Sequence, residues 1–175
     1  MFFNLKNTFF REIEICDASY IVKLRNNKTL NKFIHNKTIT LLSQKNYIKE
    51  YFNQNLSKRT SYYFIIINKH KKQKCGSVRL ILKEKNIFTW GSWILDHNKS
   101  FTAAIDTLLF VYSFYTKKKF TNCYFDVRKT NLKTISIHLK SGAKIIRETN
   151  EDYFFEMSKE NAKKFCKKYK NLIIT

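Results

Sequence analysis

The 175-residue chain has no proline and only three glycines, Gly76, Gly91 and Gly142. Segments rich in glycine, proline or serine usually form the flexible linkers between domains, and the chain contains none. It also has no internal repeat, which excludes the architectures that are built from repeated units. The length is typical of one folding unit, so we expect residues 1–175 to form a single domain.

Long apolar runs and metal-type spacings are missing as well. The longest apolar stretch, residues 101–115, contains Asp106 and is shorter than the roughly 20 residues that cross a bilayer. The four cysteines lie far apart, at positions 16, 75, 123 and 166, with no Cys-x-x-Cys pair and no histidine at a zinc-ligand spacing. No secretion signal is recognisable near the N-terminus. We therefore expect no metal site, no membrane span, reduced thiols and a cytoplasmic protein.

Acidic residues are scarce, with 13 Asp and Glu against 34 Lys and Arg, and the formal net charge is +21. Such a balance attracts polyanions, including nucleic acids, nucleotide cofactors and phosphorylated substrates. The lysines are scattered along the chain, which equally fits a compositional drift without a partner. We expect no specific nucleic acid partner, because the chain lacks a zinc finger, a helix-turn-helix and the aromatic pattern of RNA-binding modules.

Hydrophobic periodicity predicts an α/β fold. Strands are predicted at residues 9–16, 61–68, 76–83, 87–95, 120–128, 144–146 and 153–157. Helices are predicted after a cap at Asp17, from Ser43, and at about 100–115, 131–141 and 159–170. This order predicts a central mixed sheet of six to seven strands with helices on both faces. The step from residue 95 to residue 120 requires a right-handed parallel crossover.

Two glycines predict special backbone geometry. Gly142 follows a predicted helix, where a left-handed residue caps the last carbonyl groups. Gly91 lies in the middle of a predicted strand, where glycine usually marks a bulge or a close approach by another backbone. A bulge there would separate this strand from its neighbour and leave amides and carbonyls unpaired. Those groups could bind an extended ligand that runs like a strand.

The most specific pattern is Asn131 at the start of a helix, His138 seven residues later and Gly142 eleven residues later. With the element order and the bulged strand, this resembles the GNAT superfamily of acetyltransferases over nearly the whole chain. The resemblance implies acetyl-CoA as co-substrate, with its pantetheine arm along the bulged strand. The cofactor contacts that it implies are Trp93, Ile94 and Leu95 on that strand, Asn131, and the helix start at Lys99, Ser100, Phe101, Thr102, Ala103 and Ala104.

The helix start departs from the family pattern, which usually carries an Arg or Gln and two glycines. Residues 96–104 contain no glycine. A helix N-terminus still offers free amides and a partial positive charge to a pyrophosphate group, and Lys99 adds charge. The small side chains of Ser100, Thr102, Ala103 and Ala104 permit close approach. The phosphate site is therefore expected at this point of the chain.

His138 occupies the position of a family tyrosine that protonates the departing thiolate, and imidazole can do this near neutral pH. The resemblance thus makes His138 the candidate catalytic residue. The alternative is a structural histidine on a half-buried helix face. No general base is evident. Asp126 shares a strand face with Arg128 and is expected to pair with it, Glu12 and Glu14 lie on an exposed strand face, and a water relay needs no carboxylate.

The segment Leu24-Arg25-Asn26 and the polar loop after it resemble the amine-substrate loop of family members that act on nucleotide-linked amino sugars or on protein N-termini. The resemblance thus implies an acceptor site beneath this loop. Arg25 suits a phosphate or carboxylate because its planar fork binds such groups through two hydrogen bonds. The predicted substrate-binding residues are Arg25, Asn26, His35, Tyr63, Trp90 and Ser92. The expected acceptor is the primary amine of a nucleotide-linked amino sugar used in surface polysaccharide synthesis. The alternatives are a protein or peptide N-terminus and, from another class, a non-catalytic nucleic-acid or ribosome-binding module. The sequence leaves monomer and homodimer open.

Overall fold

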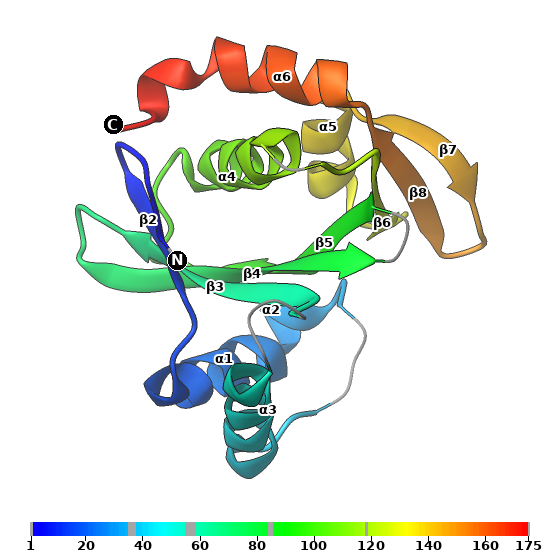
Figure 1. Cartoon of the computed structure of the whole chain (residues 1–175). Helices are drawn as coiled ribbons and strands as arrows, with labels where there is room; N and C mark the ends of the chain where they lie inside the picture. Colours follow the sequence, from blue (N-terminus) through cyan, green and yellow to red (C-terminus); the bar gives the residue numbers. More distant parts are fainter. Residues whose placement is uncertain (1, 35–37, 55–58, 84–85, 118, 175) are drawn as a thin grey trace.

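An eight-stranded sheet forms the middle layer of the molecule (Figure 1). The computed structural model describes residues 2–34, 38–54, 59–83, 86–117 and 119–174. The strands are β1 (Phe2–Asn4), β2 (Thr8–Glu12), β3 (Ser61–Asn68), β4 (Gln73–Lys83), β5 (Ile87–Leu95), β6 (Asn122–Arg128), β7 (Lys144–Glu148) and β8 (Asp152–Met157). Their order in the sheet is β1-β2-β3-β4-β5-β6-β8-β7, and every neighbouring pair is antiparallel except β5 and β6.

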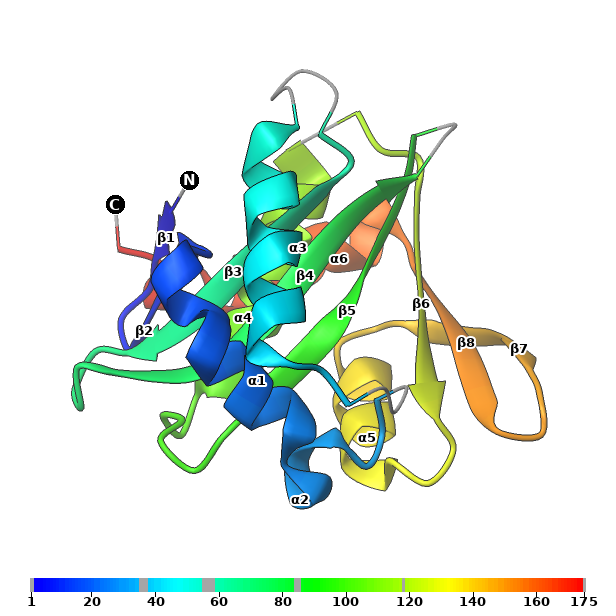
Figure 2. The same cartoon turned by 90° about the horizontal axis from the view of Figure 1, so that it is seen from below.

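Helices cover both faces of the sheet, as Figures 1 and 2 show. One face carries α1 (Ala18–Asn26), α2 (Lys28–Asn31) and α3 (Leu41–Asn53). The other carries α4 (Ala103–Lys117), α5 (Leu132–Lys140) and α6 (Lys159–Lys168). Short 3-10 turns also occur in the described residues, among them η1 (Ile15–Asp17) and η4 (Lys170–Leu172). Among the described residues, no helix is long and apolar enough to cross a membrane.

Each face of the sheet has its own hydrophobic core, because successive strand residues point to opposite faces. Phe64 and Ile66 of β3 belong to the larger core under α4 and α6. Tyr63 and Ile65, which alternate with them along β3, belong to the smaller core on the other face. This core also contains Ile21 of α1 and other side chains of α1 and α3. The mixed sheet with helices on both faces confirms the predicted fold class.

The sheet has one or two strands more than expected. Phe2–Asn4 forms a short edge strand on β2, with Phe3 opposite Phe10, and three residues give too little periodicity for a sequence-based prediction. The strand predicted at 9–16 ends at Glu12, because residues 15–17 form the turn η1. The short helix α2 was not predicted either. Asn27 begins it by accepting hydrogen bonds from the amides of Thr29 and Leu30.

Two predicted helix caps are wrong in detail. Asp17 precedes α1, but its fully buried carboxylate does not accept from an amide of this helix. It binds Arg11 at 2.7 and 2.8 Å and Lys74 at 2.6 Å, so long-range ion pairs replace the local cap. At the start of α3 the cap is Thr40. Ser43 is the third helical residue and exchanges hydrogen bonds of 3.1 Å with Thr40.

The predicted bulge in β5 is confirmed, but the unusual backbone angle lies one residue further on. Arg79 pairs with Gly91 and Ser77 pairs with Ile94, so β5 contains one residue more than β4 over this stretch. Ser92 has φ 47° and takes the left-handed conformation that glycine usually supplies. A Cβ atom at Gly91 would meet no atom within 4 Å. Gly142 has φ 95°, as its capping role predicts.

The close backbone approach occurs instead at Gly76. A Cβ atom there would collide with the carbonyl oxygen of Ile94 and would lie 2.8 Å from Cδ2 of Leu95. Gly76 is therefore required for β4 to pair with the far end of β5. The parallel pairing of β5 with β6 runs only from Ile87 to Thr89. Beyond Thr89 the two strands diverge toward α5 (Figure 2).

Candidate active site

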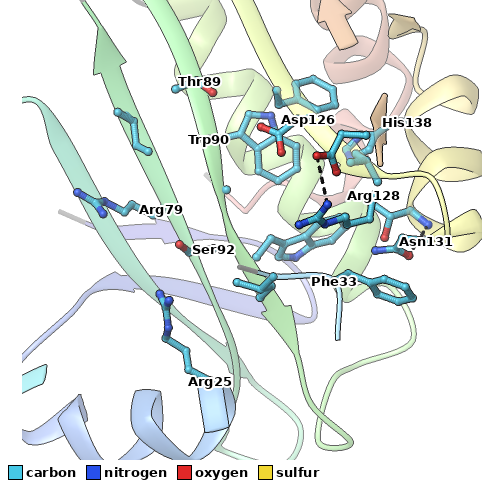
Figure 3. A pocket seen from close by; sticks show the side chains of 18 of the residues that line it. Arg25, Phe33, Arg79, Thr89, Trp90, Ser92, Asp126, Arg128, Asn131 and His138 are labelled. Carbon is cyan, nitrogen blue, oxygen red and sulfur yellow. Dashed lines mark hydrogen bonds and ion pairs between the residues drawn. The ribbon is translucent and has the colours of Figure 1, made fainter. Parts of the chain in front are cut away.

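A cavity of about 570 Å³ opens where β5 and β6 diverge. Its walls come from the end of α1, the segment around α2, strands β4, β5 and β6, and the helix α5 (Figure 3). Binding sites for small ligands commonly have volumes of about 300–1,000 Å³. The cavity can therefore hold a ligand of substantial size at the bulge.

The cavity reaches both faces of the sheet. Trp90 and Phe125 belong to the core under α4, on the side where His138 of α5 also lies. The neighbouring residues Thr89 and Asp126 point to the opposite face by strand alternation, and both line the cavity. Two ligands can thus enter from opposite faces and meet between β5 and β6.

His138 lies in an aromatic cage. Its ring centroid is 4.5 Å from that of Phe125, 5.4 Å from Trp90, 5.7 Å from Phe155 and 6.1 Å from Trp93. Only 1% of the residue is exposed, and this burial lowers the pKa of His138 to about 3. Nδ1 of His138 and Nε1 of both tryptophans are buried and have no hydrogen-bond partner within the described parts of the chain.

The low pKa limits what His138 can do. With a pKa of about 3, roughly one ring in 10⁴ carries a second proton at pH 7. The cage therefore holds a neutral imidazole, which can donate one hydrogen bond and can accept another. Expulsion of water from such a site strengthens any hydrogen bond that the ring makes to a developing charge.

Asn131 caps the start of α5, as the sequence pattern suggests. Its side chain accepts a hydrogen bond of 3.3 Å from the amide of Thr134. Both residues line the cavity, so the start of α5 faces the gap between the strands. A helix start is suited to hold an electronegative group of a ligand.

Arg79 of β4 is a cavity residue that the sequence did not single out. Its Nη2 donates a hydrogen bond of 3.2 Å to Oγ of Ser61, and its guanidinium lies 5.4 Å from the ring centroid of Tyr47. The sequence shows only that Arg79 lies on the more polar face of a predicted strand. That it pairs with Gly91 beside the bulge is known only from the register of β4 with β5.

The structure brings together six of the predicted residues in the cavity wall: Arg25, Trp90, Ser92, Trp93, Asn131 and His138. The other described candidates are not among the lining residues: Asn26, Tyr63, Ile94, Leu95, Lys99, Ser100, Phe101, Thr102, Ala103 and Ala104. His35 lies outside the described residues. The side chain of Asn26 is occupied in holding the loop, since it donates to the carbonyl of Ile39 at 2.9 Å and accepts from its amide at 3.1 Å.

The start of α4 differs from a simple phosphate site. The hydroxyl of Thr102 accepts from Asn7 at 2.9 Å and donates to the buried carboxylate of Asp106 at 2.8 Å. Thr8 donates to the same carboxylate at 3.0 Å, and burial raises the pKa of Asp106. Ala103 is fully buried. Phosphate contacts at this helix start therefore depend on backbone amides and on the exposed Lys99.

Two of the carboxylates considered as a general base, Glu12 and Glu14, lie outside the cavity wall. The carboxylate of Glu12 accepts hydrogen bonds from Tyr51 and, at 2.6 Å, from Arg59, and Glu14 lies 3.7 Å from Arg11. Neither glutamate lines the cavity. Arg128 forms ion pairs with Glu151 and, at 3.5 Å, with Asp152.

Asp126 is exposed and lines the cavity on the face of α1. No group of three or more His, Cys, Asp or Glu side chains in the described residues is placed to hold a metal ion.

Neither family models nor curated protein sequences give a match to the chain. Among solved structures, it is similar to apo FdhC, described as a nucleotide-linked sugar GNAT, with 34% identity over 99% of both chains and a TM-score of 0.88. Two others are only 13% identical and show the fold alone. A GNAT-family acetyltransferase from Bacillus anthracis has a TM-score of 0.74 and covers 91% of this chain and 99% of its own. A spermidine N-acetyltransferase from Vibrio cholerae in complex with CoA and spermine has a TM-score of 0.77, and the match covers 89% of this chain and 98% of its own. The chain belongs to the GNAT superfamily of N-acetyltransferases.

Proposed function

We propose that the protein transfers an acetyl group from acetyl-CoA to the primary amine of a nucleotide-linked amino sugar. The observation that carries this proposal is the 34% identity, over 99% of both chains, to a GNAT described as acting on a nucleotide-linked sugar. A cavity that reaches both faces of the sheet supports it, because the reaction must bring two substrates together. The four described cysteines are free, as a cytoplasmic location would require.

The residues around the bulge fit the thioester end of acetyl-CoA. The unpaired edge of β5 beyond Thr89 offers backbone groups to an extended arm, and the buried Nε1 atoms of Trp90 and Trp93 lack partners within the described chain. Buried polar groups normally have a partner, so a ligand acceptor at this point would satisfy them. When bound, acetyl-CoA would supply the activated acetyl group, and Asn131 with the start of α5 would hold it.

We assign His138 the role of a neutral hydrogen-bond donor to the departing sulfur. Its pKa of about 3 excludes a stored proton at neutral pH, but one ring nitrogen of the neutral imidazole still carries a hydrogen. A donor fixed by four aromatic rings loses little order when negative charge develops. Attack by the neutral amine leaves its nitrogen positively charged. The proton that this nitrogen loses as the amide forms then reaches the thiolate, directly or through water.

The acceptor amine would approach from the face of α1 and α2. It must lose its proton to attack, because only the neutral amine carries a free lone pair. Asp126, exposed on this face, is the carboxylate that we assign to orient the amine or take its proton. A polycationic acceptor such as spermine fits poorly, because Arg25, Arg79 and Lys83 all line the cavity.

Two measurements test the proposal in order. Acetyl-CoA at 100 times its dissociation constant should stabilise the fold by about 2.7 kcal/mol, which raises Tm by about 5–10 °C for a chain of this size. A thiol-release screen should then give turnover with a nucleotide-linked amino sugar and not with short peptides or spermine. No change of Tm at millimolar acetyl-CoA would contradict the enzymatic assignment. Turnover with peptides but not with nucleotide-linked amino sugars would mean that the acceptor is a peptide N-terminus.

A further inference from the structure

The face of the cavity toward α1 and α3 is rich in hydrogen-bond donors. Arg25 and Arg79 line it, and the buried Nε atom of Arg79 has no hydrogen-bond partner within the described chain. Behind Arg79, the buried hydroxyl of Tyr47 also lacks a partner there. Unpaired buried donors are unfavourable and rare in folded proteins, so this grouping requires an explanation.

The two arginines come from different elements of the fold. Both arginines line the same cavity, although Arg25 lies in the last turn of α1 and Arg79 in the middle of β4. Figure 3 shows Arg25 and Arg79 on the same side of the cavity, across β5 from His138.

Neither arginine has a carboxylate partner in the described chain. The ion pairs found there use other cations: Arg11, Arg59, Lys74, Arg128, Lys129 and Lys164. Partly buried arginines are normally neutralised by an acid or a ligand anion. Two guanidinium groups on one cavity wall, neither of them in an ion pair within the described chain, form a site that an anion with two charged groups would complete.

Arg79 is already held in place without a ligand. Its Nη2 is bonded to Oγ of Ser61 at 3.2 Å, and its guanidinium lies over the ring of Tyr47 at 5.4 Å. A group that is ordered before binding loses less freedom when its ligand arrives. Arg79 also pairs with Gly91 across the strands, next to the bulge. An anion held there would be close to the point of transfer.

We propose that Arg25 and Arg79 bind the diphosphate of the acceptor, with Ser61 and Tyr47 as positioning residues for Arg79. This inference rests on the proposed function, since it assumes that the acceptor carries a nucleoside diphosphate. The planar guanidinium forms two parallel hydrogen bonds to a phosphate, which a lysine cannot reproduce. The diphosphate would fix the sugar so that its amine points into the gap between Gly91 and Asp126.

The test compares Arg79→Gln, Arg79→Lys and Arg25→Gln with Arg147→Gln. Arg147 on β7 gives the same change of net charge outside the cavity wall. KM is measured for the nucleotide-linked amino sugar, for the same amino sugar without the nucleotide, and for acetyl-CoA. We expect KM for the nucleotide-linked sugar to rise about 10- to 100-fold in both glutamine variants, with partial recovery in Arg79→Lys.

KM for the amino sugar without the nucleotide and KM for acetyl-CoA should change less than about threefold in these variants. All three KM values should also change less than about threefold in Arg147→Gln, as expected for a surface substitution. An equal loss on both sugars would overturn the proposal, because it would mean that the arginines act on the sugar or on folding. Unchanged kinetics in Arg25→Gln and Arg79→Gln would overturn it as well. Tm is measured on each variant to detect loss of folding.

Direct binding separates this inference from the proposed function. Uridine and thymidine diphosphates are titrated into the parent and the variants by calorimetry, with acetate and glycine as carboxylate probes. Binding of a nucleoside diphosphate that weakens at least about tenfold in Arg79→Gln supports the inference even if no sugar is acetylated. Binding of a carboxylate probe but of no nucleoside diphosphate would mean that the arginines recognise a carboxylate and would overturn the inference. Absence of binding by all of these probes would overturn the inference of an anion site here.

Discussion

The imidazole of His138 on α5 lies 5.4 Å from the indole ring of Trp90 on β5, in an edge-to-face arrangement. This contact joins the helix that follows the diverging strands to the bulged strand itself. Trp93 packs against the same histidine, although it is three residues from Trp90. Strict alternation would send the two indoles to opposite faces, so the extra residue at the bulge brings them together. The site around His138 therefore depends on the backbone geometry of β5.

Gly91 and Gly76 form a matched pair for mutation. In Gly91→Val the side chain projects into open space, so Tm should stay within a few degrees of the parent. The same side chain narrows the cavity where the acceptor enters, and turnover should fall by about tenfold or more. In Gly76→Ala the new methyl group meets the Ile94 carbonyl, and the free energy of unfolding should fall by about 1–3 kcal/mol.

Thermal denaturation and thiol release on the two variants distinguish these effects. Full activity in Gly91→Val would move the acceptor path away from this part of β5. A Gly76→Ala protein as stable as the parent would mean that β4 and β5 can separate at their far ends without cost.

Ser92 carries the strained backbone of the bulge. Its φ of 47° is disfavoured for β-branched residues, so Ser92→Val should lower the free energy of unfolding by about 1–3 kcal/mol and should lower turnover. Ser92→Gly should keep or slightly raise stability, because glycine adopts this conformation readily. Thr89→Val, in the regular part of β5, is the control for stability alone, and its Tm should stay close to that of the parent. Equal Tm values for Ser92→Val and Thr89→Val would show that the bulge relaxes freely.

The main elements of the fold could be predicted because their signals are local. The predicted strands 61–68 and 87–95 coincide with β3 and β5, since each is a short run rich in apolar and aromatic residues with polar residues on both sides. Asp17 was misread because its partners, Arg11 and Lys74, come from β2 and β4 and outweigh the local capping preference. Long-range ion pairs of this kind leave no periodic trace in a sequence.

The site was only partly predictable for the same reason. Asn131, His138 and Gly142 follow a spacing along one helix, which a sequence displays directly. The burial of His138 depends on Phe125 and Phe155, which come from β6 and β8. The position of Arg79 beside the bulge depends on the register of β4 with β5. Both facts arise from packing between distant segments.

The cage around His138 should make the protein sensitive to acid. Its folded pKa of about 3 lies below the ordinary 6.5, so between these values the unfolded chain binds a proton that the folded chain does not. The free energy of unfolding is unaffected by this group above pH 6.5 and falls as the pH decreases below it. The loss reaches about 3 kcal/mol at pH 4.

The measurement is urea denaturation between pH 8 and pH 4. His138→Phe should lose less stability than the parent over this range, because phenylalanine fills the cage and cannot be protonated. His97→Gln, at an exposed histidine after β5, should keep the slope of the parent. Identical slopes for the parent and His138→Phe would mean that the ring is solvated in the folded protein.

The kinetics of His138 variants decide how the ring contributes to transfer. A positioned proton donor is worth about 10²–10⁴ in rate. A neutral hydrogen-bond donor to a developing charge is worth about 1.5–3 kcal/mol, or about 10- to 150-fold. Because the pKa of His138 is about 3, we expect His138→Ala to lower kcat by the smaller amount. KM for acetyl-CoA should change little, since the bond strengthens only as charge builds on sulfur.

His138→Tyr should recover part of this loss, because a phenol donates a hydrogen bond in its neutral form near pH 7. The profile of kcat against pH should show no rise below pH 7 that disappears in His138→Ala, since the ring does not titrate there. A loss above about 10³-fold together with such a rise would mean that bound substrate raises the pKa of the ring and that it delivers a full proton. An Ala variant with lowered Tm and near-normal kcat would leave His138 as a structural residue that packs β5 against α5.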